Sequence, residues 1–272
     1  MAITSHDQFI DAMANRSQHV TIAKASVTSQ VANFYTSLWR SAGEPALPSI
    51  PTTPEIPSNA STGAAKFTNP TGGRSSYISR LFCVSSVAST DVHVFDRLAH
   101  MGGLSGNSTA VQDVNLSVAG TNNNLVARKG ASDYSDVRWF LEWHGQTNSV
   151  TMNITITYTN GGGVSGRTTT VAYTGTHAAG RTEPIMGIDG EPIRSIETIA
   201  LGTSTGALGN IGVVAVRPLT SVSLGAVNSG VVANAIDLGL PKVEDSACLF
   251  FMLLPGGTTS GILNGSMKII QG

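Results

Sequence analysis

The sequence predicts a mainly β protein, an antiparallel β-sandwich or jelly roll of about ten strands, with a short helical N-terminal region and a polyproline segment. Beyond residue 75, short apolar or alternating runs are broken by Gly, Asn and Ser at sandwich-like intervals. No helical pattern alternates with these runs, which argues against an α/β fold. Hydrophobic residues make up 41% of the 272 residues and charged residues 12%. This balance excludes disorder and permits a sizeable core.

Helical patterns are confined to the N-terminal region. Ser5 and Gln8 have the spacing of a capping box and precede an amphipathic run. A second stretch, Val27–Ala42, has apolar residues at helical spacing and ends at Gly43. We expect this stretch either to pack on its own domain or to dock on a neighbouring subunit. In the second case its partner-contact residues are Phe34, Leu38 and Trp39.

Proline recurs at every third position in the segment that follows: Pro45, Pro48, Pro51, Pro54 and Pro57. Polyproline II has three residues per turn, so the five rings would line one edge of an extended segment about 40 Å long. It could be a stiff spacer, an arm laid along another protein or a ligand for a proline-reading module. We expect residues 1–75 to form an assembly arm whose prolines contact a partner, and residues 76–272 to form the β-sandwich domain.

The clearest strand is predicted at Val150–Tyr158, where apolar and polar residues alternate strictly. A glycine-rich turn follows, and Thr168–Val171 returns, which indicates a β-hairpin. Ile211–Val216 and Cys248–Leu254, the latter within the expected strand Ala247–Leu254, are continuously apolar, so we expect central strands covered on both faces. Left at a free edge, the second would be an aggregation hazard, so it must be paired or covered, by this chain or by another subunit. Further strands are expected at Tyr77–Val84, Val92–Leu98, Val111–Val118, Val137–His144, Arg167–Tyr173, Ile193–Leu201 and Gly261–Ile270.

The charge balance argues against several classes of partner. The net charge is −1 and there is no basic run, so we expect no contact with nucleic acid, whose binding needs a basic excess. No stretch has the ~20 apolar residues of a membrane helix and the N-terminus has no signal-peptide pattern, so we expect a soluble protein without membrane contact. Cys83 and Cys248 lie in apolar runs, which predicts buried free thiols.

Patterns that would carry chemistry are weak. Asp91, His93, Asp96 and His100 are dense, but alternation along a strand puts Asp96 on the face opposite Asp91 and His93. Three carboxyl residues lie near one another in sequence, without any sign that they converge: Asp133, Asp136 and Glu142. We therefore predict no catalytic residue, no cofactor and no metal site.

The aromatic run Trp139–Trp143 has two interpretations. Aromatic side chains usually anchor a core, and we expect that role here. The alternative is an exposed platform for a host-surface glycan.

Charge is missing from long parts of the sequence. Between Glu142 and Arg181 only Arg167 is charged, and residues 218–236 and 246–267 carry no charge. Charge depletion marks the cores of protein–protein interfaces, whereas an isolated soluble domain keeps more charge on its outer faces. The sequence thus predicts a homo-oligomeric subunit whose sheets are largely covered in an assembly.

The segment Phe95–Gly106 resembles a set of tailed-bacteriophage virion structural proteins, which carry a similar Asp-Arg-Leu…Gly-Gly-Leu-Ser-Gly run after a short helical N-terminus. The aromatic strand Trp139–Trp143 and the run Gly166–Val171 are also similar to theirs. The resemblance extends from about Ser5 to Pro218 and is closest to capsid decoration (cement) proteins.

This resemblance implies a virion protein on the capsid surface, made in the bacterial host cytoplasm, with the major capsid protein and its own copies as partners. It implies a homotrimer and carries over no catalytic residue. A tail or head–neck component, or an adhesin-like glycan-binding module, is the alternative. An enzyme such as a glycan hydrolase is a third, and it would need paired carboxylates in a cleft.

Overall fold

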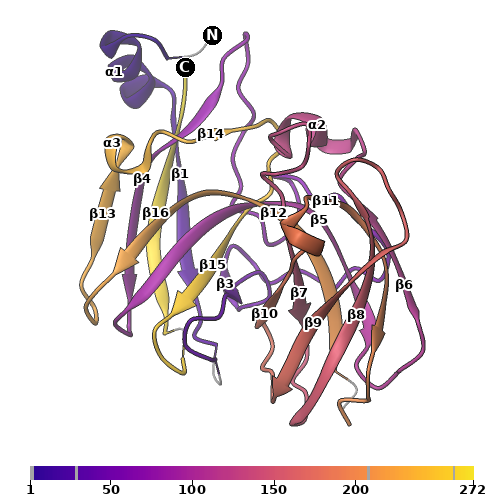
Figure 1. Ribbon diagram of the computed structural model, residues 1–272. Helices are drawn as coiled ribbons and strands as arrows, with labels where there is room; N and C mark the ends of the chain where they lie inside the picture. The colour runs from indigo at the N-terminus through magenta and orange to yellow at the C-terminus, as the bar shows by residue number, and fades with distance from the viewer. Residues whose placement is uncertain (1–2, 28–29, 207–208, 260) are drawn as a thin grey trace.

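The computed structural model describes residues 3–27, 30–206, 209–259 and 261–272. It confirms a mainly β fold in which the strands pair antiparallel (Figure 1). The described residues also form the helices α1 (His6–Asn15), α2 (Leu125–Arg128) and α3 (Ala235–Leu238) and the single turns η1 (Asn122–Asn124) and η2 (Ile188–Gly190). No helix in this part of the chain is long and apolar enough to cross a membrane.

The strands form three sheets. The terminal sheet has the order β13 (Val231–Asn234), β4 (Ser76–Ser85), β16 (Leu263–Gln271), β1 (Ser17–Lys24) and β3 (Gly43–Glu44), with β14 (Lys242–Val243) also paired to β4. The central sheet has the order β10 (Thr182–Ile185), β7 (Arg138–Trp143), β12 (Asn210–Leu224), β5 (Thr90–Ser105), β15 (Leu249–Pro255) and β2 (Thr36–Ser37). The distal sheet has the order β6 (Gln112–Ser117), β11 (Ile193–Leu201), β8 (Val150–Asn160) and β9 (Arg167–Gly175).

Each strand predicted from the sequence is present, and the hairpin of β8 and β9 is confirmed. The described residues hold sixteen strands because β1, β2, β3, β10, β13 and β14 were not predicted. All of these except β1 have two to four residues, too few for a period-two pattern to emerge. β1 directly follows α1, where the sequence pattern indicated only helix.

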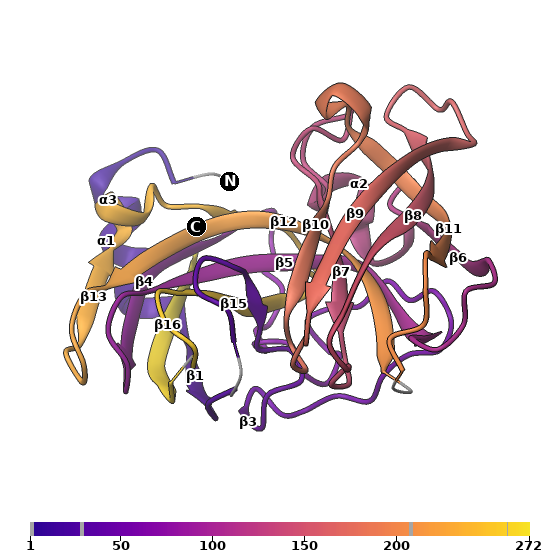
Figure 2. The same ribbon diagram turned by 60° about the horizontal axis from the view of Figure 1, so that its bottom comes forward.

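The central sheet is shared by two sandwiches. Figure 2 shows β5 and β12 running from the side of the terminal sheet to the side of the distal sheet. Ile211 and Val213 of β12 pack with the distal sheet, whereas Val222 and Leu224, farther along the same strand, pack with the terminal sheet. The pairing of β12 with β5 shifts register between these two parts, on both sides of Pro218. Such bulges bend a strand, which lets one pair of strands serve both cores.

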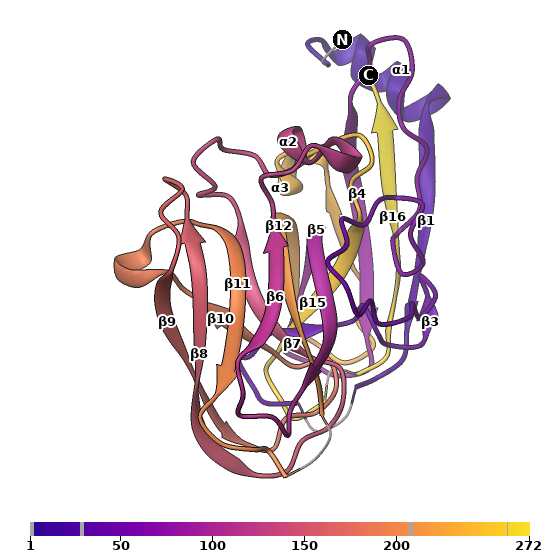
Figure 3. The same cartoon turned by 90° about the vertical axis from the view of Figure 1, so that its right-hand side faces the viewer.

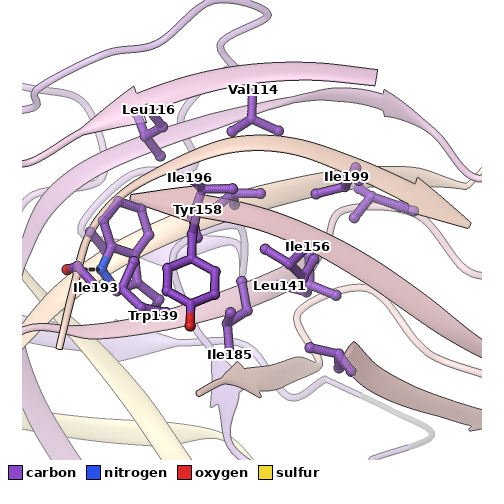
Figure 4. Close-up of a cluster of buried hydrophobic side chains, with 14 of the residues drawn as sticks. Val114, Leu116, Trp139, Leu141, Ile156, Tyr158, Ile185, Ile193, Ile196 and Ile199 are labelled. Carbon is purple, nitrogen blue, oxygen red and sulfur yellow. Dashed lines mark hydrogen bonds between the residues drawn. The ribbon is translucent and has the colours of Figure 1, made fainter. Parts of the chain in front are cut away.

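The core between the central and distal sheets is built from alternate residues of both (Figure 4). Ile156 and Tyr158 of β8 point inward with Leu141 of β7, and Ile154 is buried in the same cluster. Trp139 also lies in this core, 2% exposed, and its Nε1 donates a hydrogen bond of 2.9 Å to the Ile193 carbonyl. The interpretation of the aromatic run as core is therefore confirmed.

The opposite face of the central sheet is covered by the N-terminal segment of the same chain. Phe250 and Met252 of β15 and Val214 of β12 pack there against Trp39 and Ala64. The apolar strand β15 is thus covered on both faces within one chain, so the aggregation hazard predicted for Leu249–Leu254 does not require a second subunit.

Cys83 and Cys248 are free and buried, as predicted. Burial raises the pKa of the Cys83 thiol to about 12 and also raises the pKa of the Cys248 thiol.

The first predicted helix is confirmed as α1, with Ser5 as its N-cap accepting a hydrogen bond from the Gln8 backbone. The second, Val27–Ala42, is wrong for the residues that the structure describes; residues 28 and 29 lie outside them. Leu38 donates its backbone N–H to Phe251 of β15, and Ser37 donates its N–H to Gly180. These backbone groups pair with other strands, so the helical spacing of the apolar side chains is overridden by tertiary contacts.

The proline segment lies against the chain's own central sheet. Pro51 accepts a hydrogen bond of 2.7 Å from the Gly102 backbone, and Glu55 exchanges two backbone hydrogen bonds with His100 of β5. The three-residue period is visible in the burial, because Pro45, Pro48 and Pro57 are buried while their neighbours are mostly exposed. One edge of the segment therefore faces the protein, as a polyproline II segment would allow, but the surface it covers is its own.

The structure accordingly corrects the expectation that residues 1–75 stand apart from the sandwich as an arm. β1 is an internal strand of the terminal sheet, paired with β16 from Ser17↔Ile270 to Lys24↔Leu263. Trp39 and Leu38 fill the cores on either face of the central sheet. Whether residues 76–272 can fold alone stays a prediction, and these contacts argue that they cannot.

The role of Trp39 can be tested by truncation. We expect Trp39→Ala to lower the free energy of unfolding by ~3–5 kcal/mol, because it empties a site that is 2% exposed. Leu47→Ala, in the same segment but at a residue 47% exposed, should cost less than about 1 kcal/mol. Urea unfolding of the full chain measures both. Equal, small losses would restore the view of the N-terminal segment as a detachable arm.

Candidate interaction surfaces

The outer face of the β8–β9 hairpin is a flat, uncharged array of small polar side chains. Four cross-strand pairs point outward, in a register that continues without a shift from one end of the hairpin to the other. We call these residues the threonine face: Thr151 opposite Thr174, Asn153 opposite Ala172, Thr155 opposite Thr170 and Thr157 opposite Thr168. Among all residues of the two strands only Arg167 is charged, and it forms an ion pair with Glu191.

The alternation of β8 explains this face. Met152, Ile154 and Ile156 are buried against the central sheet, so the residues between them must point to solvent. β-branched threonine suits a half-exposed strand, and its hydroxyl is satisfied by water without a charge. The face therefore combines a regular backbone register with side chains that lose less hydration energy than charged groups when covered.

A cleft of about 540 Å³ lies where the segment 33–35 meets β7, β10 and the start of β11. Its walls are largely apolar and include Tyr35, Tyr134 and Trp139. Among its large hydrophobic side chains, Phe34 is 37% exposed and Met186 is 64% exposed. The Arg181 guanidinium lies 4.3 Å from the centre of the Phe34 ring, which fixes that ring by a cation–π contact.

The predicted partner-contact residues divide into two groups. Leu38, Trp39, Pro45, Pro48 and Pro57 are buried inside this chain, and Pro51 is half-buried. Phe34 and Pro54 are exposed. Contact with a partner stays a prediction, and only the exposed pair presents a surface for it. The buried residues were singled out correctly as apolar and periodic, but sequence spacing does not say which chain covers them.

Asp96 and Arg97, in the segment Phe95–Gly106, each form a buried ion pair. The sequence alone predicts neither pair. Asp96 of β5 binds Arg128 of α2 in a bidentate pair of 2.6 and 2.9 Å. The other Arg128 donors reach the carbonyls of Asn123, Pro57 and Arg97, at 3.1, 2.8 and 2.8 Å. All five N–H donors of a guanidinium are then used, which offsets much of the cost of burying its charge.

Arg97, the next residue of β5, forms the second pair. Its Nη2 contacts Glu142 of β7, and its Nε donates a 2.9 Å hydrogen bond to His100 Nδ1. The guanidinium lies 4.7 Å from the centre of the Trp39 ring. Burial raises the pKa of Glu142, but the charges of Arg97 and His144 and the hydrogen bonds from Arg97 and Ser37 together outweigh it and lower that pKa to about 2. Glu142 is therefore a carboxylate at neutral pH.

His144 and His100 stay neutral beside this pair. Burial lowers the pKa of His144 to about 4, with Arg97 and Arg40 acting in the same direction and Glu142 opposing them. Burial and Arg97 also lower the pKa of His100. A Cβ on Gly212 would lie 2.4 Å from His144 Nε2, so the glycine leaves the room that this ring occupies.

The possible metal ligands do not converge. His93 packs edge-on against Tyr35, with ring centroids 5.1 Å apart, whereas Asp96 is held by Arg128. Over the described ranges, no group of three or more His, Cys, Asp or Glu residues is placed to hold a metal ion.

The carboxyl residues weighed for a hydrolase are bound separately. Asp133 accepts hydrogen bonds from Ser135, and Asp136 accepts one of 2.9 Å from the Ala131 backbone. Glu142 is buried in its ion pair with Arg97. These contacts do not form the acid–base pair that glycoside hydrolysis requires.

Comparison with known proteins gives no family. No family model matches the chain, and no curated protein matches it. Among solved structures, the infectious bursal disease virus VP2 subviral particle aligns over 94% of this chain and 79% of that chain, with 11% identity and a TM-score of 0.19. The Gx strain of the same virus aligns over the same shares with 11% identity and a TM-score of 0.21. These neighbours are viral capsid proteins, but scores this low do not show a shared fold.

The buried histidine makes stability depend on pH. An unfolded histidine has a pKa near 6.5, so the unfolded chain takes up a proton before His144 does as the pH falls from about 6.5 to about 4. His144 should by itself lower the free energy of unfolding by about 3 kcal/mol across this window, and His100 and His93, whose pKa values burial also lowers, add to the loss. Glu142 adds a further loss below pH ~4.5, toward its own pKa of about 2.

His144→Gln should flatten this dependence between pH 6.5 and 4, whereas His6→Gln, at an exposed histidine, should leave it unchanged. Urea unfolding at half-unit pH steps measures both. If wild type and His144→Gln had the same slope, His144 would not be the group that titrates.

Proposed function

We propose that this chain is a structural protein of a tailed-phage particle, which binds the capsid exterior and stabilises it through protein–protein contacts. The threonine face is the observation that carries the proposal. Its register is regular and its side chains are uncharged across two long strands, and charge depletion of this kind marks protein–protein contact surfaces. The resemblance of Phe95–Gly106 to virion structural proteins supports the same function.

The segment Phe95–Gly106, which carries the resemblance, has a structural role in this chain. Asp96 and Arg97 hold the two buried ion pairs, and Gly102 and Gly103 lie where the proline segment crosses β5. A Cβ at Gly102 would lie 2.4 Å from Ile50, and Gly103 has a φ of +80° that favours glycine. The segment therefore fastens the N-terminal cover to the central sheet.

The glycan-binding alternative loses its sequence basis. Trp139 and Trp143 are 2% and 0% exposed and face the core, so neither forms a sugar platform. A tail or head–neck position is an outcome of the same experiment that tests the capsid. Cryo-electron microscopy of the particle places the chain directly, and density on the capsid exterior is the result we expect.

Attachment should depend on the threonine face. We expect Thr155→Lys to weaken binding to particles that lack the protein by about tenfold or more, because a buried unpaired ammonium group is costly. Thr71→Lys, at an exposed threonine outside the distal sheet, is the matched control and should bind like wild type. Co-sedimentation with the particles measures both variants. Equal binding by the two would rule out the threonine face as the capsid contact.

Attachment should also be insensitive to salt. Screening acts on charges, and the threonine face has none. Binding should change less than about twofold between low salt and ~0.5 M salt. The same co-sedimentation assay across a salt series measures this. A steep loss of binding with salt would mean that a charged surface elsewhere makes the contact.

A further inference from the structure

The edge strands of the three sheets are protected very unequally. Among the described strands, the edges β2, β3 and β14 have two residues each, and β10 and β13 have four, with Pro184 inside β10. The edge strand β6 carries the charged Asp113 and has Asn115 in a left-handed conformation, φ 48°. Short length, proline, charge and irregular backbone are the devices by which proteins prevent edge-to-edge pairing.

β9 has none of these devices. It is nine residues long, pairs with β8 alone, and keeps an unbroken register over its whole length. It contains no proline and no lysine, and its one charge, Arg167, lies at its first position and is paired with Glu191. Figure 3 shows β9 at the outer border of the distal sheet. Half of its backbone N–H and C=O groups point away from β8, where another strand can pair with them.

We propose that β9 is a contact between copies of this chain, pairing edge to edge and antiparallel with β9 of a second copy. This contact adds detail to the proposed function, and the role of the contact in a particle rests on that function. A twofold axis at Val171 joins the two distal sheets into one and doubles the threonine face without adding a charge. Such a contact closes on itself and needs no second surface.

The side chains of β9 are self-complementary in this register. Thr168 lies opposite Thr174 and Thr170 opposite Ala172, all outward-facing, while inward-facing Thr169 lies opposite Tyr173. Inner and outer faces therefore match across the seam, as pairing within one sheet requires. Arg167 lies opposite Gly175 and keeps its own Glu191, so no like charges meet. A single-residue slip would set buried positions against exposed ones, which favours registers of this parity.

The contact is twofold, whereas the sequence resemblance implies a trimer. The test is sedimentation velocity of the full chain over a concentration series, with Thr170→Lys and Thr155→Lys compared with wild type. Thr155 is the cross-strand neighbour of Thr170 on the same exposed face, but it lies one strand in from the edge. We expect wild type to form dimers, Thr170→Lys to weaken dimerisation by about tenfold or more and Thr155→Lys to change it by less than about threefold.

Hydrogen exchange supplies a readout that needs no variant. Amides of β9 should be protected more strongly in concentrated than in dilute wild-type protein, while those of β11 should not change. A wild-type chain that stays monomeric at about 100 µM, equal effects of the two lysines, or a trimer unaffected by Thr170→Lys would overturn the β9 contact. Failure of this contact leaves the proposed function standing if Thr155→Lys still weakens attachment. Dimers that do not attach to particles would overturn the function and keep the contact.

Discussion

Asp96 and Arg97 are neighbours in the middle of β5, and each places its charge in a different part of the interior. Asp96 reaches α2 and the end of the proline segment through Arg128, whereas Arg97 reaches Glu142 on β7 and the ring of Trp39. Each ion pair is almost wholly buried. Removing one member of such a pair leaves an uncompensated charge, at a cost of about 3–5 kcal/mol. Buried charges of this kind tolerate few arrangements of the surrounding elements.

The two ion pairs lie where the parts of the molecule meet. β5 gives side chains to both cores of the central sheet, and the N-terminal segment closes the face that neither the terminal nor the distal sheet covers. The hydrogen bond from Gly102 to Pro51 and the pair of bonds between Glu55 and His100 bind the proline segment to the same strand. The sandwiches are consequently packed on one shared sheet, and the strands of the threonine face pack on it through the distal core.

Much of the fold could be predicted because alternating apolar and polar residues mark many of the strands in the sequence. β8 is the clearest case, and its period-two pattern places the four β8 residues of the threonine face correctly. The N-terminal region is less predictable, because the apolar spacing of Val31, Phe34 and Leu38 fits a helix while the Leu38 backbone pairs with β15. Val31 and Phe34 are in fact exposed and Leu38 is buried. Local spacing cannot reveal that Leu38 binds the backbone of Phe251, more than two hundred residues away.

The candidate surfaces show the same division. The sequence shows that β8 and β9 carry no charge besides Arg167, and this scarcity of charge predicts a covered sheet. The sequence does not show that β9 is an unprotected edge strand, because that depends on which strands pair with β8 and which do not. Likewise, Asp96 and Arg128 lie in two segments that only the fold brings together, so their ion pair cannot be predicted from the sequence.

The pairing of β1 with β16 bears on how the protein is made. Ser17 is opposite Ile270, so β1 pairs with a strand more than two hundred residues farther along the chain. The distal sheet and its partner strands β7 and the first part of β12 all precede that strand in the sequence. A chain made from its N-terminus therefore holds every strand of the distal sheet while β1 still lacks β16, the neighbour that separates it from β4. The terminal sheet thus depends on more distant parts of the sequence than the distal sheet does.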